Sequence, residues 1–174
     1  MKSSVIIFPG SNCDRDMDVA LKKFGFKNKM VWHNDIELPK SDLVVLPGGF
    51  SYGDYLRCGA MASKSKIMQS VINFAKSGGF LMGICNGFQI LTELGLLPGA
   101  LTRNRDLNFI CENTTLKVMS HRTDWFCGRK VGEQISLPIA HGEGCYQCTR
   151  DTLHKLQDQD SIALRYVNNP NGSL

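Results

Sequence analysis

Long hydrophobic runs and clusters of basic residues are both missing from this sequence of 174 residues. No apolar run approaches the roughly 20 residues that a membrane-spanning helix needs, and the apolar segment near Met1 is too short for the hydrophobic region of a signal peptide. The net charge is only +4, and the Lys and Arg residues are scattered along the chain. We therefore expect neither a membrane span nor a nucleic-acid-binding surface.

A regular cysteine spacing is missing as well. The chain has an odd number of cysteines, seven in all: Cys13, Cys58, Cys85, Cys111, Cys127, Cys145 and Cys148. Small domains that depend on disulfides usually carry an even number at recurring intervals, and such bonds are rare in a reducing compartment. The pattern predicts free thiols and a cytoplasmic location.

One short segment leaves a metal site open as an alternative. His141 and Glu143 are followed by Cys145 and Cys148, which superficially resembles the His-x-Glu and Cys-x-x-Cys halves of a zinc deaminase signature. Those halves normally lie on separate helices, and a proline precedes the cysteines, whereas here one residue separates them. We expect no metal site, although three potential ligands this close could form a partial zinc site.

The hydrophobic period changes in the middle of residues 80–94. Residues 80–84 form a short apolar run after two glycines, which is typical of a buried parallel strand. From Phe88 onward, apolar residues recur every three or four positions, as on the buried face of a helix. Cys85 lies where the predicted strand meets the predicted helix, with Gly83 and Gly87 on either side of it.

This Gly-x-Cys-x-Gly pattern is the cysteine form of the nucleophile elbow. A strand that turns sharply into a helix strains its central residue and leaves no room for side chains at the flanking positions. The sulfur of Cys85 would then lie at a helix N-terminus, where free N–H groups favour a thiolate and can bind a developing oxyanion. We interpret Cys85 as a catalytic nucleophile; a structural cysteine in an ordinary turn is the alternative.

The pattern before residue 98 predicts an α/β fold. Three apolar segments predict strands, at residues 4–8, 29–32 and 43–46, in addition to the strand before Cys85. Helical stripes follow at residues 17–24 and 61–77. This order predicts a flavodoxin-like, mostly parallel sheet with helices on both faces.

The C-terminal part of the sequence has a different pattern of predicted elements. Short strand-like pieces at residues 109–111, 114–119 and 135–139 follow one another without helices between them. We therefore expect additional antiparallel or mixed strands there. The glycine-bracketed turn at residues 141–144 would present His141 and Glu143; a turn histidine is more often a satisfied polar group than a catalyst.

Three loops are expected to meet at the carboxyl edge of the parallel sheet, where such folds place their sites. They are residues 9–14, residues 47–57 and the turn at Cys85. The middle loop is rich in glycine, and backbone N–H groups freed by glycine can complete an oxyanion hole. Neither a Lys-Ser/Thr ending nor a Gly-x-Gly-x-x-Gly spacing is present, which argues against a phosphate-binding loop.

Five segments together resemble the class I, triad-type glutamine amidotransferases: residues 8–16, 47–57, 83–89, 138–144 and 169–173. The second and third segments are typical of the small glutaminase subunits of de novo purine biosynthesis, whereas the elbow alone fits any class I glutaminase. Since the segments span the chain, the resemblance implies that residues 1–174 form one amidotransferase domain.

The resemblance also implies roles for individual residues. Cys85 would attack the side-chain amide of glutamine and form a glutamyl thioester, and the backbone N–H groups of Gly49 and Asn86 would hold the oxyanion. Gln89, one helical turn into the elbow helix, would help bind glutamine. Ammonia would pass to a synthetase subunit, assembled with a small accessory subunit. ATP and Mg²⁺ are implied to bind the synthetase, so no cofactor is expected on this chain.

One part of the family pattern does not match. In the family, the general base and its orienting acid lie in a His-Pro-Glu segment, one strand beyond the Asn-Pro-Asn-Gly-Ser turn. The histidines here are His33, His121, His141 and His154, and none precedes Pro-Glu. We expect that the sequence as given is truncated and lacks the C-terminal strand and this segment. His141 is the candidate for a replacement base.

Two other functions stay open at this point. A chain without a base would be a defective glutaminase, because an ordinary thiol is only a few per cent thiolate at pH 7. Such a chain could serve as a non-catalytic binding module with the amidotransferase fold. The other alternative is a different elbow enzyme, such as a cysteine hydrolase, and the loop at residues 47–57 and Gln89 count against it.

Overall fold

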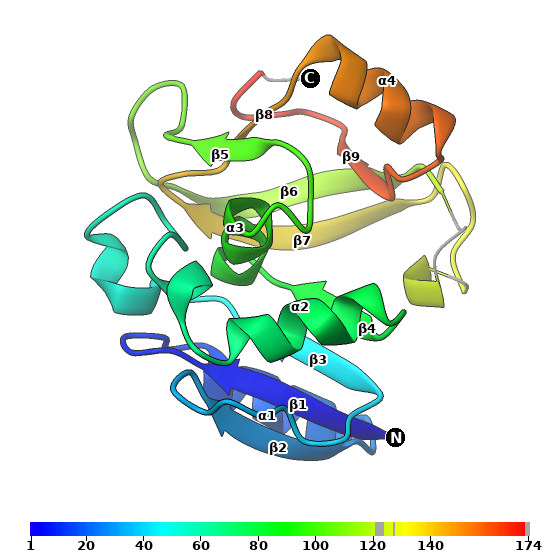
Figure 1. Cartoon of the computed structure of the whole chain (residues 1–174). Helices are drawn as coiled ribbons and strands as arrows, with labels where there is room; N and C mark the ends of the chain where they lie inside the picture. Colours follow the sequence, from blue (N-terminus) through cyan, green and yellow to red (C-terminus); the bar gives the residue numbers. More distant parts are fainter. Residues whose placement is uncertain (121–123, 127, 173–174) are drawn as a thin grey trace. The chain divides into compact units, whose positions relative to one another are not determined.

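The computed structural model describes residues 1–120, 124–126 and 128–172 of the chain. Its backbone divides into two compact units, Met1–Leu97 and Pro98–Leu174, coloured blue to green and green to red in Figure 1. Three residues that belong to the predicted features lie outside the described ranges: His121, Cys127 and Ser173. No helix in the described part of the chain is both long enough and apolar enough to cross a membrane.

The first unit is built on a four-stranded sheet. Its strands are β1 (Lys2–Ile7), β2 (Lys27–Trp32), β3 (Leu43–Leu46) and β4 (Phe80–Gly83). They lie in the order β2-β1-β3-β4, and every neighbouring pair is parallel. This order matches the first strands of the flavodoxin-like arrangement, so the parallel sheet predicted from the sequence is confirmed.

Helix α1 (Asp14–Lys23) covers one face of this sheet. Its Leu21 packs with Val5 and Val45 in one of two hydrophobic clusters of the unit. Successive residues of a strand point to opposite faces, so Val44, next to Val45, lies in the other cluster. A fully buried strand such as β3 therefore contributes to both clusters, as its continuous apolar run predicts.

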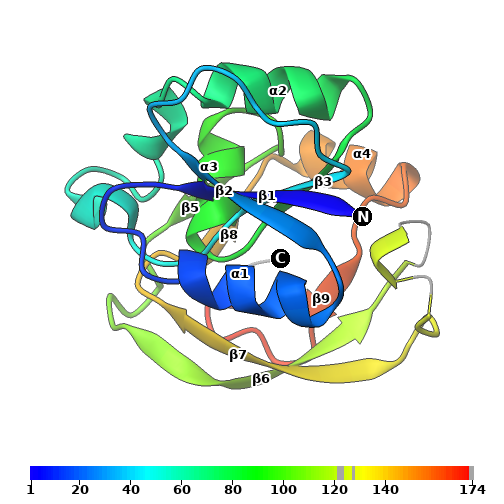
Figure 2. The same cartoon turned by 90° about the horizontal axis from the view of Figure 1, so that it is seen from below.

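Helices α2 (Met68–Lys76) and α3 (Asn86–Glu93) belong to the other face. Val71 of α2 and Ile90 of α3 are fully buried in the second cluster with Val44. Figure 2 shows α1 and α2 on opposite sides of the strands. The prediction of helices on both faces is thus confirmed, and it places the start of α3 directly after β4.

The helix predicted over residues 61–77 is wrong in its first part. Residues Ala62–Lys64 form only a short 3-10 turn, η2, and the α-helix begins at Met68. Between them the backbone at Ser65 is extended, with ψ of 147°. The hydroxyl of Ser63 donates to the carbonyl of Ala60 (2.7 Å), and serines that bond to nearby backbone favour turns over helix interiors.

The second unit contains a three-stranded antiparallel sheet. Its strands are β6 (Ile110–Val118), β7 (Gln134–His141) and β9 (Leu164–Tyr166), in the order β7-β6-β9. β6 pairs with β7 along its length, and the short 3-10 turn η3 (Asp124–Phe126) lies between them in sequence. The antiparallel strands expected after residue 98 are confirmed, with the first two predicted pieces joined in one strand.

The sequence-based prediction did not include strand β9 or the turn η3, and it missed three further elements of the second unit. A second antiparallel pair joins β5 (Ala100–Thr102) to β8 (Cys145–Gln147). Helix α4 (Arg150–Asp158) follows, and the side chain of Thr149 accepts a hydrogen bond from Thr152 N at its start. No residue of α4 is buried, and Leu153 and Leu156 are its only apolar residues.

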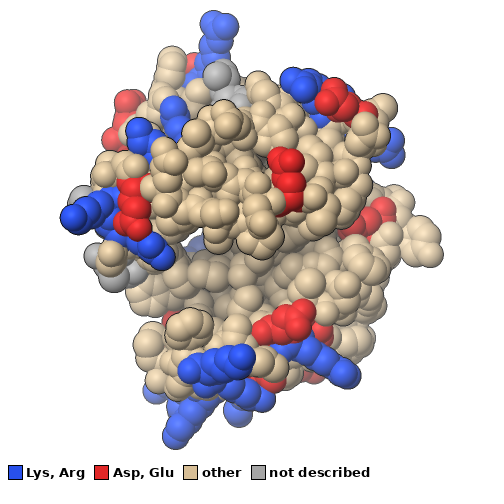
Figure 3. Space-filling view, turned by 180° about the vertical axis from the view of Figure 1, so that it is seen from behind, with Lys and Arg blue, Asp and Glu red and all other residues tan. Residues whose placement is uncertain are grey.

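Charges of both signs lie near one another on the surface. On the face in Figure 3, Lys and Arg side chains stand beside Asp and Glu side chains. The ion pairs of the structure include Lys22–Asp18 (2.7 Å) in α1 and Arg129–Glu133 (2.6 Å). Exposed pairs of this kind contribute little stability.

Candidate active site

Cys85 occupies a strained turn between β4 and α3. Its backbone has φ of 50° and ψ of −107°, a region that non-glycine residues rarely adopt. A Cβ on Gly83 would lie 2.6 Å from the carbonyl oxygen of Gly87, and one on Gly87 would lie 2.0 Å from the carbonyl oxygen of Leu46. The steric requirement for two flanking glycines, predicted from the sequence, is therefore confirmed.

The three loops predicted to meet at the carboxyl edge of the sheet do so. A Cβ on Gly48 would lie 3.5 Å from the Cβ of Cys85 and 3.7 Å from the Cβ of Cys13. Gly49 has φ of +118°, and a Cβ there would lie 2.5 Å from the side-chain oxygen of Asn12. The first loop therefore packs directly against the middle loop beside the thiol. This close contact leaves room only for glycine at position 49.

Several groups act on the Cys85 thiol, and their net effect is to raise its pKa. The largest is burial, which raises the pKa even though part of the residue is exposed to solvent. The backbone N–H of Asn86 lowers the pKa, Cys13 and then Asp54 raise it, and the backbone N–H of Gly49 lowers it. The predicted stabilisation of a thiolate is thus present but outweighed, so the thiol is protonated at neutral pH and needs a base.

The two predicted oxyanion donors come from different segments. Asn86 is the first residue of α3, whereas Gly49 follows β3 in the middle loop. Their N–H groups both act on the sulfur of Cys85. A carbonyl carbon bonded to that sulfur would carry its oxygen close to these two donors, which is the geometry that an oxyanion hole requires. The oxyanion roles of Gly49 and Asn86 stay predictions that this geometry supports.

Gln89 lies further inside than its predicted role suggests. It is only 7% exposed, and its side-chain oxygen accepts a hydrogen bond from the side-chain nitrogen of Asn86 (2.9 Å). The oxygen of the Asn86 side chain accepts from the hydroxyl of Ser51 (2.6 Å). The sequence analysis missed Ser51 and the side chain of Asn86, because their pairing joins residues 35 positions apart. Substrate binding by Gln89 stays a prediction.

The middle loop is anchored at its centre and at its C-terminal end despite its glycines. The hydroxyl of Tyr52 hydrogen-bonds to Nδ1 of His33 (2.8 Å) and to the hydroxyl of Ser65 (3.3 Å). Arg57 makes two hydrogen bonds with the carboxylate of Glu93 in α3, at 2.5 and 2.7 Å. The 3-10 turn η1 (Ser51–Asp54) contains the first of these anchors, and Tyr52 has positive φ there. The part of the loop that follows Gly49 is therefore tied to His33, Ser65 and α3.

His141, the candidate replacement base, ends β7 in the second unit. Its Nδ1 hydrogen-bonds to the side-chain oxygen of Asn104 (3.0 Å), and burial lowers its pKa, so the ring is neutral at pH 7. A Cβ on Gly144 would lie 2.2 Å from the ring. The ring is thus packed over the turn and held by an amide rather than by a carboxylate, and a base role for His141 stays a prediction.

Asn104 is the centre of a polar network that the sequence analysis missed. It is 1% exposed, and its side-chain nitrogen donates to the carbonyls of His141 and Asn108, both at 2.8 Å. Its oxygen also accepts from the backbone N–H of Gly144 (3.1 Å) and from the side chain of Asn171 (3.3 Å). One buried amide therefore joins three segments of the second unit.

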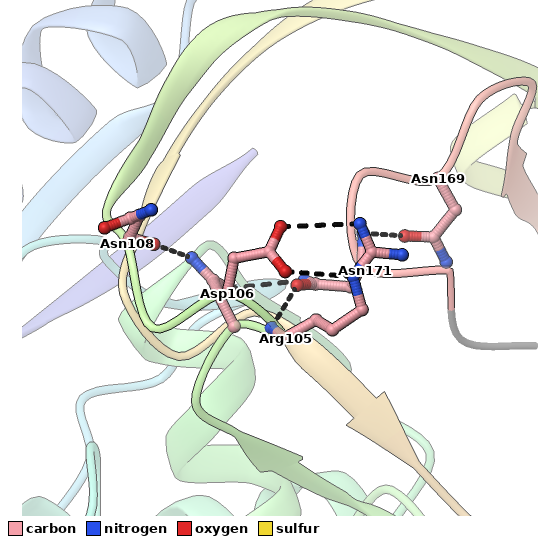
Figure 4. A network of polar contacts seen from close by, with 6 residues as sticks. Arg105, Asp106, Asn108, Asn169 and Asn171 are labelled. Carbon is pink, nitrogen blue, oxygen red and sulfur yellow. Dashed lines mark hydrogen bonds and ion pairs between the residues drawn. The ribbon is translucent and has the colours of Figure 1, made fainter.

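The Asn-Pro-Asn-Gly turn near residue 170 is part of the same network, as Figure 4 shows. The side-chain oxygen of Asn171 accepts from the backbone N–H of Arg105 (3.0 Å), and that of Asn169 accepts from the backbone N–H of Asn171 (2.9 Å). Asp106 pairs with the guanidinium of Arg105. This segment, recognised from the sequence as a turn, thus fixes the loop that precedes β6.

We expect Asn104→Ala to destabilise the second unit by about 3 kcal/mol, because it leaves several buried backbone groups without partners. Urea unfolding measures the effect as a lower midpoint. Asn113→Ala, at an exposed position of β6, is the matched control and should change the free energy of unfolding by less than about 0.5 kcal/mol. Equal midpoints for the two variants would refute the structural role of Asn104.

The described residues contain no set of ligands for the zinc site that the sequence left open. Nowhere in the described part of the chain do three or more His, Cys, Asp or Glu side chains come close enough together to hold a metal ion. The segment that suggested zinc instead ends β7 and forms β8, where Cys145 is buried and the His141 ring contacts Asn104.

A parallel sheet whose fourth strand turns into a helix at a strained cysteine defines an α/β protein of the nucleophile-elbow class. The sequence model of the CobB/CobQ-like glutamine amidotransferase domain matches residues 1–174. With the relatives described next, this match shows that the chain belongs to the glutamine amidotransferases, in the family of the PurQ subunits of phosphoribosylformylglycinamidine synthase.

The similarity to individual PurQ subunits extends over the whole sequence given. The subunit from Pelagibacter ubique is 64% identical over 183 residues, which cover 100% of this chain and 80% of the relative. The subunit from a Synechococcus species is 59% identical over 175 residues, covering 100% and 81%. Both relatives carry the name phosphoribosylformylglycinamidine synthase subunit PurQ.

Solved structures agree with the fold. The structure of PurLQS from Thermotoga maritima superposes with a TM-score of 0.89 at 44% identity, covering 99% of this chain and 77% of that chain. A glutamine amidotransferase from the same organism has a TM-score of 0.61 at 18% identity, covering 86% and 64%. The second likeness shows the fold alone.

Proposed function

We propose that this chain supplies ammonia as the glutaminase subunit of phosphoribosylformylglycinamidine synthase, with Cys85 as its nucleophile. The observation that carries the assignment of Cys85 is its position: it lies in a strained elbow, and the backbone N–H groups of Gly49 and Asn86 act on its sulfur. The family places the chain in purine biosynthesis. The alternative of a non-catalytic binding module would not require this convergence of donors on one thiol.

The chemistry begins with attack of the Cys85 thiolate on the side-chain amide carbon of glutamine. The carbonyl electron pair moves to oxygen, and the resulting oxyanion accepts hydrogen bonds from the N–H groups of Gly49 and Asn86, each contributing about 3 kcal/mol. Collapse of the intermediate breaks the C–N bond, and ammonia leaves after taking up a proton. Water then hydrolyses the glutamyl thioester, which releases glutamate and restores the thiol.

Proton transfer is essential in this scheme because burial raises the pKa of the Cys85 thiol. The thiol proton must go to a general base before or during attack, and the same group can return it to the leaving nitrogen. In the family, this base is the histidine of a His-Pro-Glu segment. We propose that the reaction proceeds with such a base, and that Gln89 contributes to glutamine binding from the first turn of α3.

The ammonia has to reach a synthetase without loss to solvent. We propose that this chain assembles with a small accessory subunit and a synthetase subunit, in line with the PurLQS assembly from Thermotoga maritima that resembles it. We propose that ATP and Mg²⁺ bind to the synthetase, since the loops after β1 and β3 carry no phosphate-binding pattern. In this proposal no cofactor binds to the present chain.

Two further proposals concern the chain as a whole. We propose that residues 1–174 belong to one amidotransferase domain, which the family match over all of these residues supports. We also propose a cytoplasmic location. Cys13, Cys111, Cys145 and Cys148 are free thiols in the structure, and free thiols persist in a reducing compartment.

Trapping of the thioester tests the assignment of Cys85. The protein is mixed with glutamine, quenched in acid and digested, and the peptides are analysed by mass spectrometry. We expect a glutamyl adduct on the peptide that contains Cys85, and none when asparagine replaces glutamine. An adduct on another cysteine, or no adduct with glutamine in the assembled complex, would overturn the proposal.

A further inference from the structure

The side chain of Asn86 is not used in the mechanism above, although it is among the most deeply buried polar groups of the first unit. Asn86 is 2% exposed, and its partners Ser51 and Gln89 are 3% and 7% exposed. An amide this deeply buried is costly unless its donors and acceptors are paired. Its contacts therefore show what it holds together.

Both ends of the Asn86 side chain are occupied. Its oxygen accepts from the hydroxyl of Ser51 (2.6 Å) and from the backbone N–H of Ser51 (3.3 Å). Its nitrogen donates to the side-chain oxygen of Gln89 (2.9 Å). Because the oxygen faces two donors and the nitrogen faces an acceptor, only one orientation of the amide satisfies all three contacts.

These contacts link the two segments that carry the predicted oxyanion donors. Ser51 lies two residues after Gly49 in the middle loop, and Gln89 lies in the first turn of α3, whose first residue is Asn86 itself. The side chain of Asn86 therefore joins the loop that carries one donor to the helix that carries the other. Donors in an oxyanion hole are effective only when they are fixed before the charge develops.

We propose that the Asn86 side chain is a positioning residue that keeps the N–H of Gly49 directed at the sulfur of Cys85 by holding Ser51 against α3. The inference rests on the proposed role of Cys85 as nucleophile. Gln89 then has a second role: from the first turn of α3, it fixes the orientation of the Asn86 side-chain amide.

The pH dependence of Cys85 alkylation tests this placement without requiring glutaminase chemistry. Iodoacetamide reacts with the thiolate, so its rate at Cys85, followed by peptide mass spectrometry, reports the pKa of the thiol. The N–H of Gly49 lowers that pKa. When Ser51→Ala or Asn86→Ala releases the loop, this effect weakens, and the alkylation profile should move to higher pH.

Glutamine turnover in the complex with the synthetase gives a second readout. We expect Ser51→Ala to lower kcat about tenfold or more, because an oxyanion donor is displaced, with a change in KM of less than about threefold. Ser51→Thr keeps the hydroxyl and should restore both the kcat and the alkylation profile. Urea midpoints for each variant show that the compared proteins are folded.

Ser63→Ala is the matched control. Ser63 is also buried, at 7% exposed, and its hydroxyl bonds to the carbonyl of Ala60 instead of to the elbow helix. It should leave the pH profile of Cys85 in place. If Ser51→Ala and Asn86→Ala also leave the profile in place, or lower kcat without moving it, the positioning role is overturned.

The experiments would give another result if the proposed function were wrong but the positioning role were correct. In that case Cys85 of the unchanged protein would be alkylated but would form no thioester with glutamine. The displacement of the alkylation profile in Ser51→Ala would still support the positioning of the Gly49 N–H. An unmoved profile would reject the positioning role whether or not the thioester forms.

Discussion

Cys85→Ala should abolish glutamine-dependent product formation, by about 10⁴-fold or more, while ammonia-dependent formation by the same complex is retained. Removal of a catalytic nucleophile costs rate factors of this order in other enzymes. Residual rates after such a change come from binding and oxyanion stabilisation alone. The measurement compares the assembled complex with glutamine and with ammonium as the nitrogen source.

The two nitrogen sources separate loss of chemistry from loss of assembly. If Cys85→Ala prevented docking on the synthetase, both activities of the complex would change together. Cys111→Ala, at an exposed cysteine of β6, is the control for thiol removal and should leave both activities within about twofold of the unchanged protein. Glutamine-dependent activity of Cys85→Ala within tenfold of the unchanged protein would refute the nucleophile assignment.

The elbow and the parallel sheet could be predicted because their causes are local in the sequence. The run before Cys85, the glycines beside it and the helical spacing after it each follow from sterics within a few residues. The clash distances at Gly83 and Gly87 show the same causes in three dimensions. Local rules of this kind are sufficient to place Cys85 at the joint between a buried strand and a helix.

The polar networks could not be predicted, because they join residues far apart in the chain. Asn104 and Asn171 are 67 positions apart, and Ser51 and Asn86 are 35 apart. Asn is common in turns for local reasons, so neither sequence position indicates a buried amide. The raised pKa of the Cys85 thiol could not be predicted for a related reason. Burial by the surrounding fold raises this pKa by more than the N–H group at the N-terminus of α3 lowers it.

Helix α4 could not be predicted from the hydrophobic pattern of the sequence. A helix is recognised in a sequence by the apolar stripe that it buries, and none of its residues is buried. The cap at Thr149 was the available signal, with its oxygen accepting from the backbone N–H of Thr152 at 3.2 Å. A cap followed by only two apolar residues, Leu153 and Leu156, does not decide between a helix and a turn.

Of the substitutions that add a single methyl group to the elbow, Gly87→Ala should be the most destabilising. The new Cβ would lie 2.0 Å from the carbonyl oxygen and 2.7 Å from the carbonyl carbon of Leu46 in β3. These are backbone atoms of a fully buried strand, so α3 and β3 must separate. Overpacking of a buried contact costs about 3 kcal/mol or more in a case this close, which lowers Tm by on the order of 10 °C in a chain of this size.

Thermal unfolding of Gly87→Ala and Gly128→Ala side by side provides the test. A Cβ at Gly128 would meet no atom of the described residues within 4 Å, and its φ lies outside the left-handed region. The control therefore separates the clash from the general effect of replacing glycine. We expect the Tm of Gly128→Ala to stay within about 2 °C of the unchanged protein. The alkylation rate of Cys85 in Gly87→Ala should also change, because α3 carries the Asn86 N–H. A Tm of Gly87→Ala equal to that of the control would mean that β3 and α3 are less tightly apposed than their backbone contact indicates.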